Sequence, residues 1–436
     1  MAFYILSKIK SFLFENKTTR QIILKNSFWL WLAEMIGKGS SFIIAILLAR
    51  HFGATIYGQW AFAISFVSLF AVFAEFGFSI LVISEVSKDK SKTPEYIDNI
   101  LAMKTILGIL VFIAISIIIQ FFRKEQAIVQ LVYFLAGYII INTFALFFRS
   151  IAQANERMEY EAVCRSINGL SLLALVAFFV FGNFSIVYIG LAYLLSAVIT
   201  TAASLLIVWH NFSTFFKKID RQICKDILSG AWPLAFGNLF SVVYGQVDTI
   251  MLSVMKTDLD VGLYNAPYSF ISGLSIIPAL IISAIYPKLS HSFLNSKQTF
   301  LKLYKTSLKY ILLLVVILIP PLFILAPQIT FLLYGTEYMA SVLAFRILLF
   351  SEACIFISYI FSYSLYAMGK QIIYARTIVG CLLLNIILNF LLIPGHSYVG
   401  ASIAAAIPNF FQITILFLLL KKFLNVNNLT KNGFEK

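Results

Sequence analysis

Residues 99–121 read NILAMKTILGILVFIAISIIIQF, a run of 23 positions in which Lys104 is the only charged side chain. As an α-helix with a rise of about 1.5 Å per residue, the run would be about 35 Å long. That length is enough to cross the hydrocarbon core of a bilayer, which needs about 20 apolar residues. The sequence therefore predicts that this segment spans a membrane.

Eleven other stretches of the chain share this character. The 436 residues are 61% hydrophobic and only 12% charged, with a mean hydropathy of +0.92, and a water-soluble core cannot hide that much apolar surface. We therefore expect an all-α polytopic membrane protein. Its twelve predicted spans lie near residues 27–49, 58–83, 99–121, 127–148, 166–184, 186–209, 227–254, 262–286, 306–326, 341–367, 371–393 and 397–420.

The positions of the 33 Lys and Arg residues indicate how these spans are oriented. If the N-terminus is cytoplasmic, 26 of the 33 lie at cytoplasmic ends and loops, and only Arg50, Arg123, Lys124 and Lys256 lie outside. Cytoplasmic loops of membrane proteins are enriched in basic residues. The bias predicts a protein of the plasma (inner) membrane with both termini in the cytoplasm. It also accounts for the net charge of +14 without a nucleic-acid partner.

A hydrophilic break between the sixth and seventh spans divides the chain into two groups of six. We expect two six-helix lobes around a central cavity, related by an axis along the membrane normal. The predicted order is an amphipathic cytoplasmic segment at 1–25, an N-terminal lobe at 26–209, a cytoplasmic linker at 210–226, a C-terminal lobe at 227–421 and a cytoplasmic tail at 422–436.

Two further patterns bear on this division. The segment IYGQWAFAISF around Tyr57 resembles LYNAPYSFISG around Tyr264, and each opens the second span of its half. The first six spans contain no proline, whereas six prolines fall within or at the ends of later spans. Because proline removes a backbone donor and bends a helix, we expect the more bent helices in the second lobe.

Charged side chains inside the spans are the candidate functional residues, because a charge at the bilayer centre costs about 2.5 to 3.5 kcal/mol on insertion scales. Glu34 and Lys38 lie one turn apart on one face of the first span. They either neutralise each other as a structural pair or line the cavity. In the second case Lys38 would bind an anionic ligand, and Glu34 would take a proton or a sodium ion.

Asp248 lies in a polar patch of the otherwise apolar seventh span. A buried carboxylate of this kind binds a cation, carries a proton or pairs with a base, and Arg346 in the tenth span is one candidate base. Asn385 and Asn389, one turn apart in the eleventh span, are expected to bond to neighbouring helices rather than to a substrate.

The sequence around the remaining charges near or within spans gives weaker evidence of a functional role. Glu75 and Glu352 are further carboxylates that could hold a cation. Arg50, Lys104 and Arg149 lie toward span ends, where snorkelling of a long basic side chain to the interface is the plainer interpretation.

Signatures of enzymes and metal sites are weak. The pattern Asp258-Leu259-Asp260 has the spacing of a metal-dependent sugar transferase, but the predicted external connections are too short to hold an acceptor. The four cysteines lie far apart in the sequence, as do the four histidines. We therefore expect no enzyme activity, no metal site and no cofactor.

Four blocks in order along most of the chain carry a family resemblance. They are LARHFGATIYGQWAFAISFVSLFAVFAEFGFSILVISEVSK at 48–88, then WPLAFGNLF, QVDTIMLS, VGLYNAPY and AIYPKLS within 232–290, LYGTEY to LYAMGK within 333–370, and NIILNFLLIPGHSYVGASIAAAIPNF at 385–410. These blocks resemble the polysaccharide flippases, the O-antigen and capsule repeat-unit branch of the multidrug/oligosaccharidyl-lipid/polysaccharide exporter superfamily.

The resemblance implies a transporter that moves a polyprenyl-diphosphate-linked oligosaccharide from the cytoplasmic to the outer leaflet for surface polysaccharide synthesis. It further implies alternating access coupled to a proton or sodium gradient, membrane lipids as surroundings, and a polysaccharide polymerase and chain-length regulator as candidate partners. A cationic cavity would meet the diphosphate or acidic sugars, with the candidates Lys38, Lys104, Arg149, Arg346 and Arg50. The candidates for the coupling ion are Asp248, Glu34, Glu75 and Glu352.

One alternative shares the expected fold. A cation-coupled multidrug antiporter would have the same arrangement of spans but a more acidic cavity. The charges within the spans, four acidic and three basic, are too balanced to separate the two functions.

Overall fold

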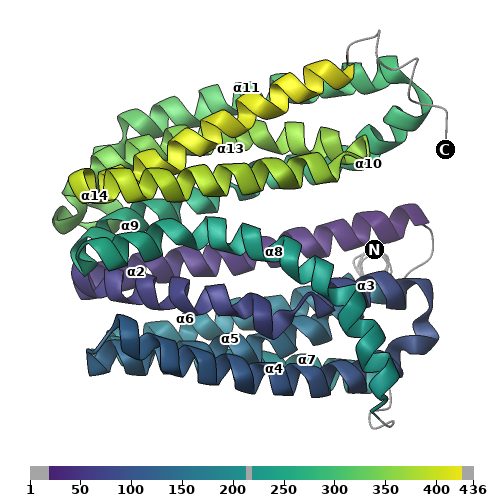
Figure 1. The fold of residues 1–436 in the computed structure, drawn as a ribbon, viewed down its shortest axis with the longest axis horizontal. Helices are drawn as coiled ribbons and strands as arrows, with labels where there is room; N and C mark the ends of the chain where they lie inside the picture. The colour runs from purple at the N-terminus through teal and green to yellow at the C-terminus, as the bar shows by residue number, and fades with distance from the viewer. Residues whose placement is uncertain (1–18, 213–218, 425–436) are drawn as a thin grey trace, which may run out of the picture. The chain divides into compact units, whose positions relative to one another are not determined.

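The computed structural model describes residues 19–212 and 219–424, and every regular element in this part of the chain is a helix (Figure 1). The predicted amphipathic segment at 1–25 and tail at 422–436 therefore lie mostly outside the described residues. In chain order the elements are α2 (Thr19–Glu75), α3 (Phe78–Lys88), η1 (Lys90–Lys92), α4 (Thr93–Phe122), α5 (Gln126–Ala154), α6 (Met158–Phe181), α7 (Ile186–Asn211), α8 (Arg221–Met255), α9 (Asp258–Leu274), α10 (Ile276–Asn295), α11 (Lys297–Ile324), α12 (Ala326–Tyr334), η2 (Thr336–Ser341), α13 (Val342–Ala367) and α14 (Gln371–Leu424).

Ten helical stretches of the described chain are long and apolar enough to cross a membrane. This confirms the predicted all-helical membrane protein, although the sequence predicts twelve spans rather than ten. Two stretches are far longer than one crossing needs, and each contains a non-helical residue: Gly53 within α2 (φ 74°, ψ 175°) and Ser397 within α14 (φ 48°, ψ −133°). Gly53 lies between the first two predicted spans, and Ser397 is the first residue of the twelfth. The number of crossings stays a prediction.

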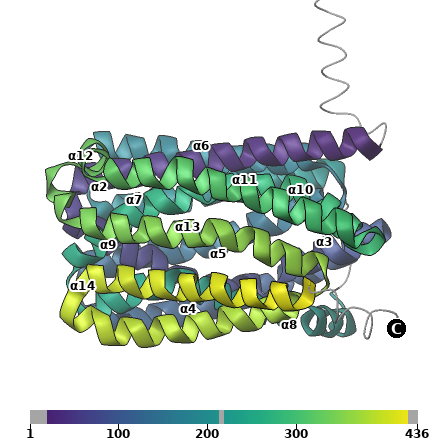
Figure 2. The ribbon, with the colours of Figure 1, turned by 90° about the horizontal axis from the view of Figure 1, so that it is seen from above.

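The chain doubles back within α14. The side chain of Asn385 donates to the carbonyl of Ala404 at 3.0 Å, so residues before Ser397 face residues after it. Gly400 packs so closely on Leu392 that a Cβ atom at Gly400 would lie 2.5 Å from the Leu392 carbonyl oxygen. The two arms of α14 run side by side in both views (Figures 1 and 2).

The described helices form two compact units. Unit 1 contains the chain up to His51 together with Ala63–Val242, and unit 2 contains Phe52–Phe62 together with the chain from Val243 onward. The first part of α8 belongs to unit 1 because Ile227 and Ala231 are buried in a hydrophobic cluster with residues of α3, α4, α5 and α7. The unit boundaries thus fall inside α2 and α8, and the predicted domain limits around 210–226 stay a prediction.

The predicted span at 58–83 is interrupted although it contains no proline. The helix α2 ends at Glu75 and α3 begins at Phe78, while Phe76 and Gly77 take left-handed φ values of 48° and 76°. A Cβ atom at Gly77 would lie 2.8 Å from the carbonyl oxygen of Ala231 in α8. Glycine here permits both the left-handed turn and the close approach of α8. Proline positions alone therefore do not mark the helix breaks.

The two segments that resemble each other in sequence pack together in unit 2. The backbone around Gly58 lies directly against Asp258 and Gly262, and Gly262 lies directly against the carbonyl of Ala54. Neither glycine has room for a side chain at this crossing. Tyr57 and Tyr264, the residues at which the two segments align, are both fully buried.

Candidate functional site

The buried carboxylate of Asp248 lies within a set of neutral hydrogen-bond donors in unit 2. Its Oδ1 atom accepts from the side-chain amides of Asn385 at 2.9 Å and Asn389 at 2.5 Å, and its Oδ2 atom accepts from the Tyr264 hydroxyl at 3.0 Å. The aspartate comes from α8, the tyrosine from α9 and the two amides from the first arm of α14. All three donors are neutral, so they satisfy the carboxylate oxygens without supplying a counter-charge.

A second observation makes this site a candidate for binding a cation. The Oδ1 atom of Asn389 is buried and accepts no hydrogen bond from any described residue. An unsatisfied buried oxygen costs about 1 to 3 kcal/mol unless a ligand or water satisfies it. Oxygen atoms of carboxylates and side-chain amides are also the ligands that hard cations prefer.

More hydrogen bonds extend this polar region across unit 2. The Tyr244 hydroxyl donates to Asn409 Oδ1 at 2.9 Å, and Asn409 Nδ2 donates to the Ser351 hydroxyl oxygen at 2.8 Å. Thr249 donates to Asn265 at 3.0 Å. These hydrogen bonds join α8, α9, α13 and α14, while Asp248 itself is bonded to α9 and to the first arm of α14.

Arg346 does not pair with Asp248. Its Nε atom donates to the carbonyl of Phe323 at 3.2 Å, and its guanidinium lies 5.2 Å from the centre of the Phe323 ring. The suggested ion pair between spans seven and ten is therefore wrong. Glu352 is buried elsewhere in unit 2 and accepts from the Ser275 hydroxyl at 2.5 Å, at the junction of α9 and α10.

Unit 1 holds a second charged site, built on Glu34 of α2. One carboxylate oxygen lies 2.6 Å from Arg165 Nη2 and the other lies 3.5 Å from Lys38 Nζ. The predicted pairing of Glu34 with Lys38 is therefore present, but the closer partner is Arg165. Two cations share one carboxylate, so the cluster carries one net positive charge, and its side chains remain 24 to 42% exposed.

Close packing of α2 on α6 brings these residues together. A Cβ atom at Gly169, one turn beyond Arg165, would lie 3.1 Å from the Ser40 hydroxyl and 3.4 Å from Gly37 Cα. Small residues at such a crossing let two helix backbones approach each other. Sequence reasoning missed Arg165 because it placed the fifth span at 166–184, whereas α6 begins at Met158.

The sequence makes Lys104 and Glu75 candidates for different roles, and the structure pairs them with each other. Lys104 Nζ lies 2.5 Å from Glu75 Oε2, and the lysine side chain is fully buried. The ammonium also lies 5.6 Å from the centre of the Phe78 ring. The other Glu75 oxygen accepts from the Ser79 backbone N–H at 2.9 Å. The pair therefore holds the start of α3, beside the break at Gly77.

The two remaining basic candidates lie in separate surroundings of unit 1. Arg149 Nε lies 3.8 Å from Glu161 Oε2, and neither of these buried atoms makes a hydrogen bond to a described residue. Nearby, Lys25 pairs with Glu159 at 3.0 Å. Arg50 is exposed, near the interruption at Gly53.

The described residues of the chain contain no cluster of His, Cys, Asp and Glu side chains that could hold a metal ion. The four cysteines are unpaired thiols. The charged groups that the structure brings together are the Asp248 carboxylate with its neutral donors in unit 2 and the Glu34, Lys38 and Arg165 cluster in unit 1.

This fold defines a class, that of the all-helical, multi-span membrane proteins. The structure is similar to an inward-facing multidrug resistance MATE family transporter of the MOP superfamily, with a TM-score of 0.73 and 16% identity over 92% of this chain and 96% of that one. It is similar to the lipid II flippase MurJ, with a TM-score of 0.72 and 15% identity over 91% and 87% of the two chains. At these identities the likeness concerns the fold.

The sequence comparison assigns the chain to a particular family. A model of the polysaccharide biosynthesis protein family matches residues 23–293, more than half of the chain, so the protein belongs to that family. Two relatives carry names that describe a provisionally assigned function. The low-salt glycan biosynthesis flippase Agl15 of Haloferax volcanii is 23% identical over 88% of this chain and 80% of its own length. An O-antigen transporter of Shigella flexneri is 25% identical over 62% and 67% of the two chains.

Proposed function

We propose that this protein is a flippase that moves polyprenyl-diphosphate-linked oligosaccharides from the cytoplasmic to the outer leaflet for surface polysaccharide synthesis. The observation that carries the proposal is the family match over residues 23–293. Two relatives named for glycan flipping and O-antigen transport support the same function. On this proposal the protein is a transporter and not an enzyme, and a polysaccharide polymerase and chain-length regulator would act on its product.

The positive cluster of unit 1 is the best-supported site for the diphosphate. Lys38 and Arg165 share the single carboxylate of Glu34 and remain partly exposed, so both can reach an anion. A guanidinium also binds phosphate oxygens in a bidentate fashion. Arg50, Arg149 and Arg346 remain candidates for other anionic parts of the substrate. Lys104 is the weakest candidate because Glu75 already neutralises it.

Asp248 is the best-supported site for the coupling ion. It is buried among neutral donors, next to the unsatisfied Asn389 oxygen. Binding of a proton or a sodium ion there would remove the negative charge from the interior of unit 2 and weaken the hydrogen bonds that join α8, α9 and α14. We propose that this change drives alternating access. Glu34 and Glu75 already pair with basic side chains, which makes them weaker candidates. Glu352, which accepts a hydrogen bond from the Ser275 hydroxyl, remains a further candidate.

The proposal includes a topology. Each arm of α2 and α14 would cross the bilayer once, which gives the twelve spans of two six-helix lobes around a central cavity. Both termini would then lie in the cytoplasm of an inner-membrane protein, as the distribution of 26 and four basic residues predicts.

Deletion of the gene in its host tests the function. We expect loss of surface polysaccharide and accumulation of a lipid-linked oligosaccharide on the cytoplasmic face, both restored by the wild-type gene. Lys38→Ala should lower the rate of transfer about tenfold or more, since hydrogen bonds to charged groups contribute about 1.5 to 3 kcal/mol. Lys302→Ala removes an exposed lysine of α11 and serves as the matched control.

The same deletion separates the two transporter classes. Unchanged surface polysaccharide together with raised sensitivity to cationic drugs in the deletion strain would identify a multidrug antiporter.

A point variant tests the site for the coupling ion. Asp248→Asn keeps the size of the side chain and removes the charge, so it should abolish the dependence of transfer on the ion gradient.

A further inference from the structure

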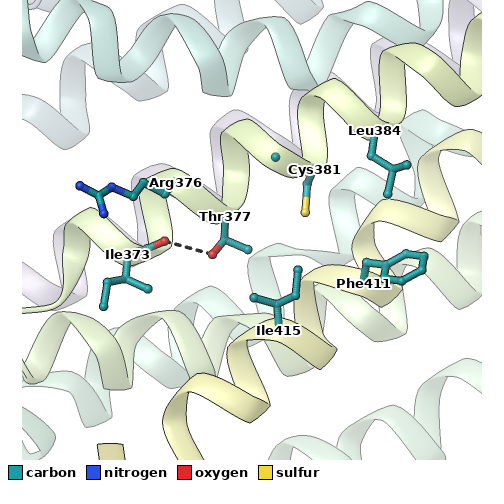
Figure 3. A pocket seen from close by; sticks show the side chains of 8 residues that line it. Ile373, Arg376, Thr377, Cys381, Leu384, Phe411 and Ile415 are labelled. Atoms are coloured by element: carbon teal, nitrogen blue, oxygen red, sulfur yellow. Dashed lines mark hydrogen bonds between the residues drawn. The ribbon is translucent and has the colours of Figure 1, made fainter. Parts of the chain in front are cut away.

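A groove between the two arms of α14 is lined by residues that belong to neither charged site. It has a volume of about 400 Å³ and is lined by Ile373, Arg376, Thr377, Gly380, Cys381, Leu384, Phe411 and Ile415. Figure 3 shows side chains from both arms around it, with Arg376 toward one end and Leu384 toward the other. Arg376 and Leu384 are eight residues apart, which corresponds to about 12 Å along the helix axis.

Apart from Arg376, the wall of this groove is apolar in character, although Thr377 and Cys381 each carry a polar group. The Thr377 hydroxyl donates to the carbonyl of Ile373 at 3.0 Å, and the Cys381 thiol donates to the carbonyl of Pro408 at 3.5 Å. Both groups are thus satisfied by backbone, and what remains for a ligand is hydrocarbon. Gly380 leaves the groove open, because a Cβ atom there would meet nothing within 4 Å.

One end of the groove is strongly basic. Arg376 is exposed and forms no salt bridge within residues 19–212 and 219–424, and α14 contains no acidic residue along its whole length. Lys370 lies over the ring of Phe423 at 5.8 Å, so the beginning and the end of α14 are neighbours. Lys421 and Lys422 therefore add positive charge at the same end. The charge distribution places this end on the cytoplasmic side.

We infer that this groove binds an anionic phospholipid of the cytoplasmic leaflet, with an acyl chain along Gly380 and Leu384 and the phosphate on Arg376. A groove in a membrane-spanning helix pair is filled by hydrocarbon, because water there would lack hydrogen-bond partners. Charge selects among the lipids. Basic pockets between membrane helices on the cytoplasmic side bind acidic head groups, with about 1 kcal/mol for each Lys or Arg near the surface. The inference does not depend on what the protein transports.

Native mass spectrometry of the purified full-length protein tests the site, with phosphatidylglycerol and phosphatidylcholine of identical acyl chains as the probes. We expect the wild-type protein to bind phosphatidylglycerol at least fivefold more tightly, from about 1 kcal/mol per basic residue. Arg376→Gln should remove this preference, and Gly380→Phe should weaken the binding of both lipids by filling the groove. Lys302→Gln and Leu383→Phe, at exposed positions outside the groove, are matched controls and should leave binding unchanged.

Several outcomes would overturn the assignment. Equal binding of the two lipids, or an unchanged preference in Arg376→Gln, would remove the head-group site. Full binding in Gly380→Phe would show that the acyl chain lies elsewhere. Displacement of phosphatidylglycerol by a lower concentration of a polyprenyl phosphate would assign the groove to polyprenyl carriers instead. Arg376 is exposed, so its variant keeps the test valid even if Gly380→Phe folds poorly.

Discussion

Lys104 illustrates what sequence can and cannot reveal about a single charge in lipid. Its position toward a span end favours snorkelling of the ammonium to the interface, and that interpretation is wrong because the side chain is fully buried and pairs with Glu75. Its partner Glu75 lies 29 positions earlier on another helix, so no local periodicity relates the two. Glu34 and Lys38, by contrast, are one turn apart, and their contact is predictable from spacing. The sequence indicates Asp248 as a lone carboxylate in an apolar span. Its hydrogen-bond donors Tyr264, Asn385 and Asn389 become evident only when three helices are assembled.

The buried pair of Lys104 and Glu75 leads to a prediction about stability. Lys104→Met leaves the Glu75 carboxylate without its counter-ion and should lower the free energy of unfolding by about 3 to 5 kcal/mol. Adding Glu75→Gln should recover most of that loss, because the double variant leaves no buried charge unpaired. Thermal unfolding of the purified protein in detergent would measure both effects, with Lys302→Met as the exposed control. If Lys104→Met kept its stability and lost only transport, Lys104 would be a substrate contact instead.

At the scale of elements, hydropathy predicts where helices lie better than where they break. All twelve predicted spans coincide with helical segments, because a long apolar run is a strong signal of a membrane-spanning helix. The span at 58–83 is nevertheless interrupted at Phe76 and Gly77, and the span at 262–286 is divided between α9 and α10. These breaks depend on tertiary contacts. Gly77 is needed because α8 approaches it, and α8 lies more than 140 residues later in the chain.

The crossing of the two similar segments gives a prediction for α9. Gly262→Ala should destabilise the protein by about 1 to 3 kcal/mol, because the added methyl group overlaps the backbone of Ala54. Gly273→Ala is the control in the same helix. Its Cβ atom meets nothing within 4 Å, and alanine gains up to about 1 kcal/mol over glycine in a helix interior. Thermal unfolding in detergent compares the two variants, and equal melting temperatures would contradict the close crossing.

At the scale of the whole molecule, the placement of charge is the strongest signal of orientation. Of the basic residues assigned to loops and ends, 26 fall on one side of the predicted membrane and four on the other. The extent of each unit cannot be inferred in this way, because a unit boundary depends on which helix faces pack together. The first part of α8 shows this, since it continues the hydrophilic break in sequence but packs with unit 1.

Orientation is tested by two conservative cysteine variants in a background without the four native cysteines. Ser91 lies between α3 and α4, and Ser185 lies between α6 and α7, so three helices separate them. If α4, α5 and α6 each cross once, Ser91→Cys and Ser185→Cys must face opposite sides of the membrane. Because Lys88, Lys90 and Lys92 flank the first site, a membrane-impermeant maleimide should label Ser185→Cys in intact cells and Ser91→Cys only after permeabilisation. Labelling of both from outside would contradict the crossing count, and the reverse pattern would contradict the orientation.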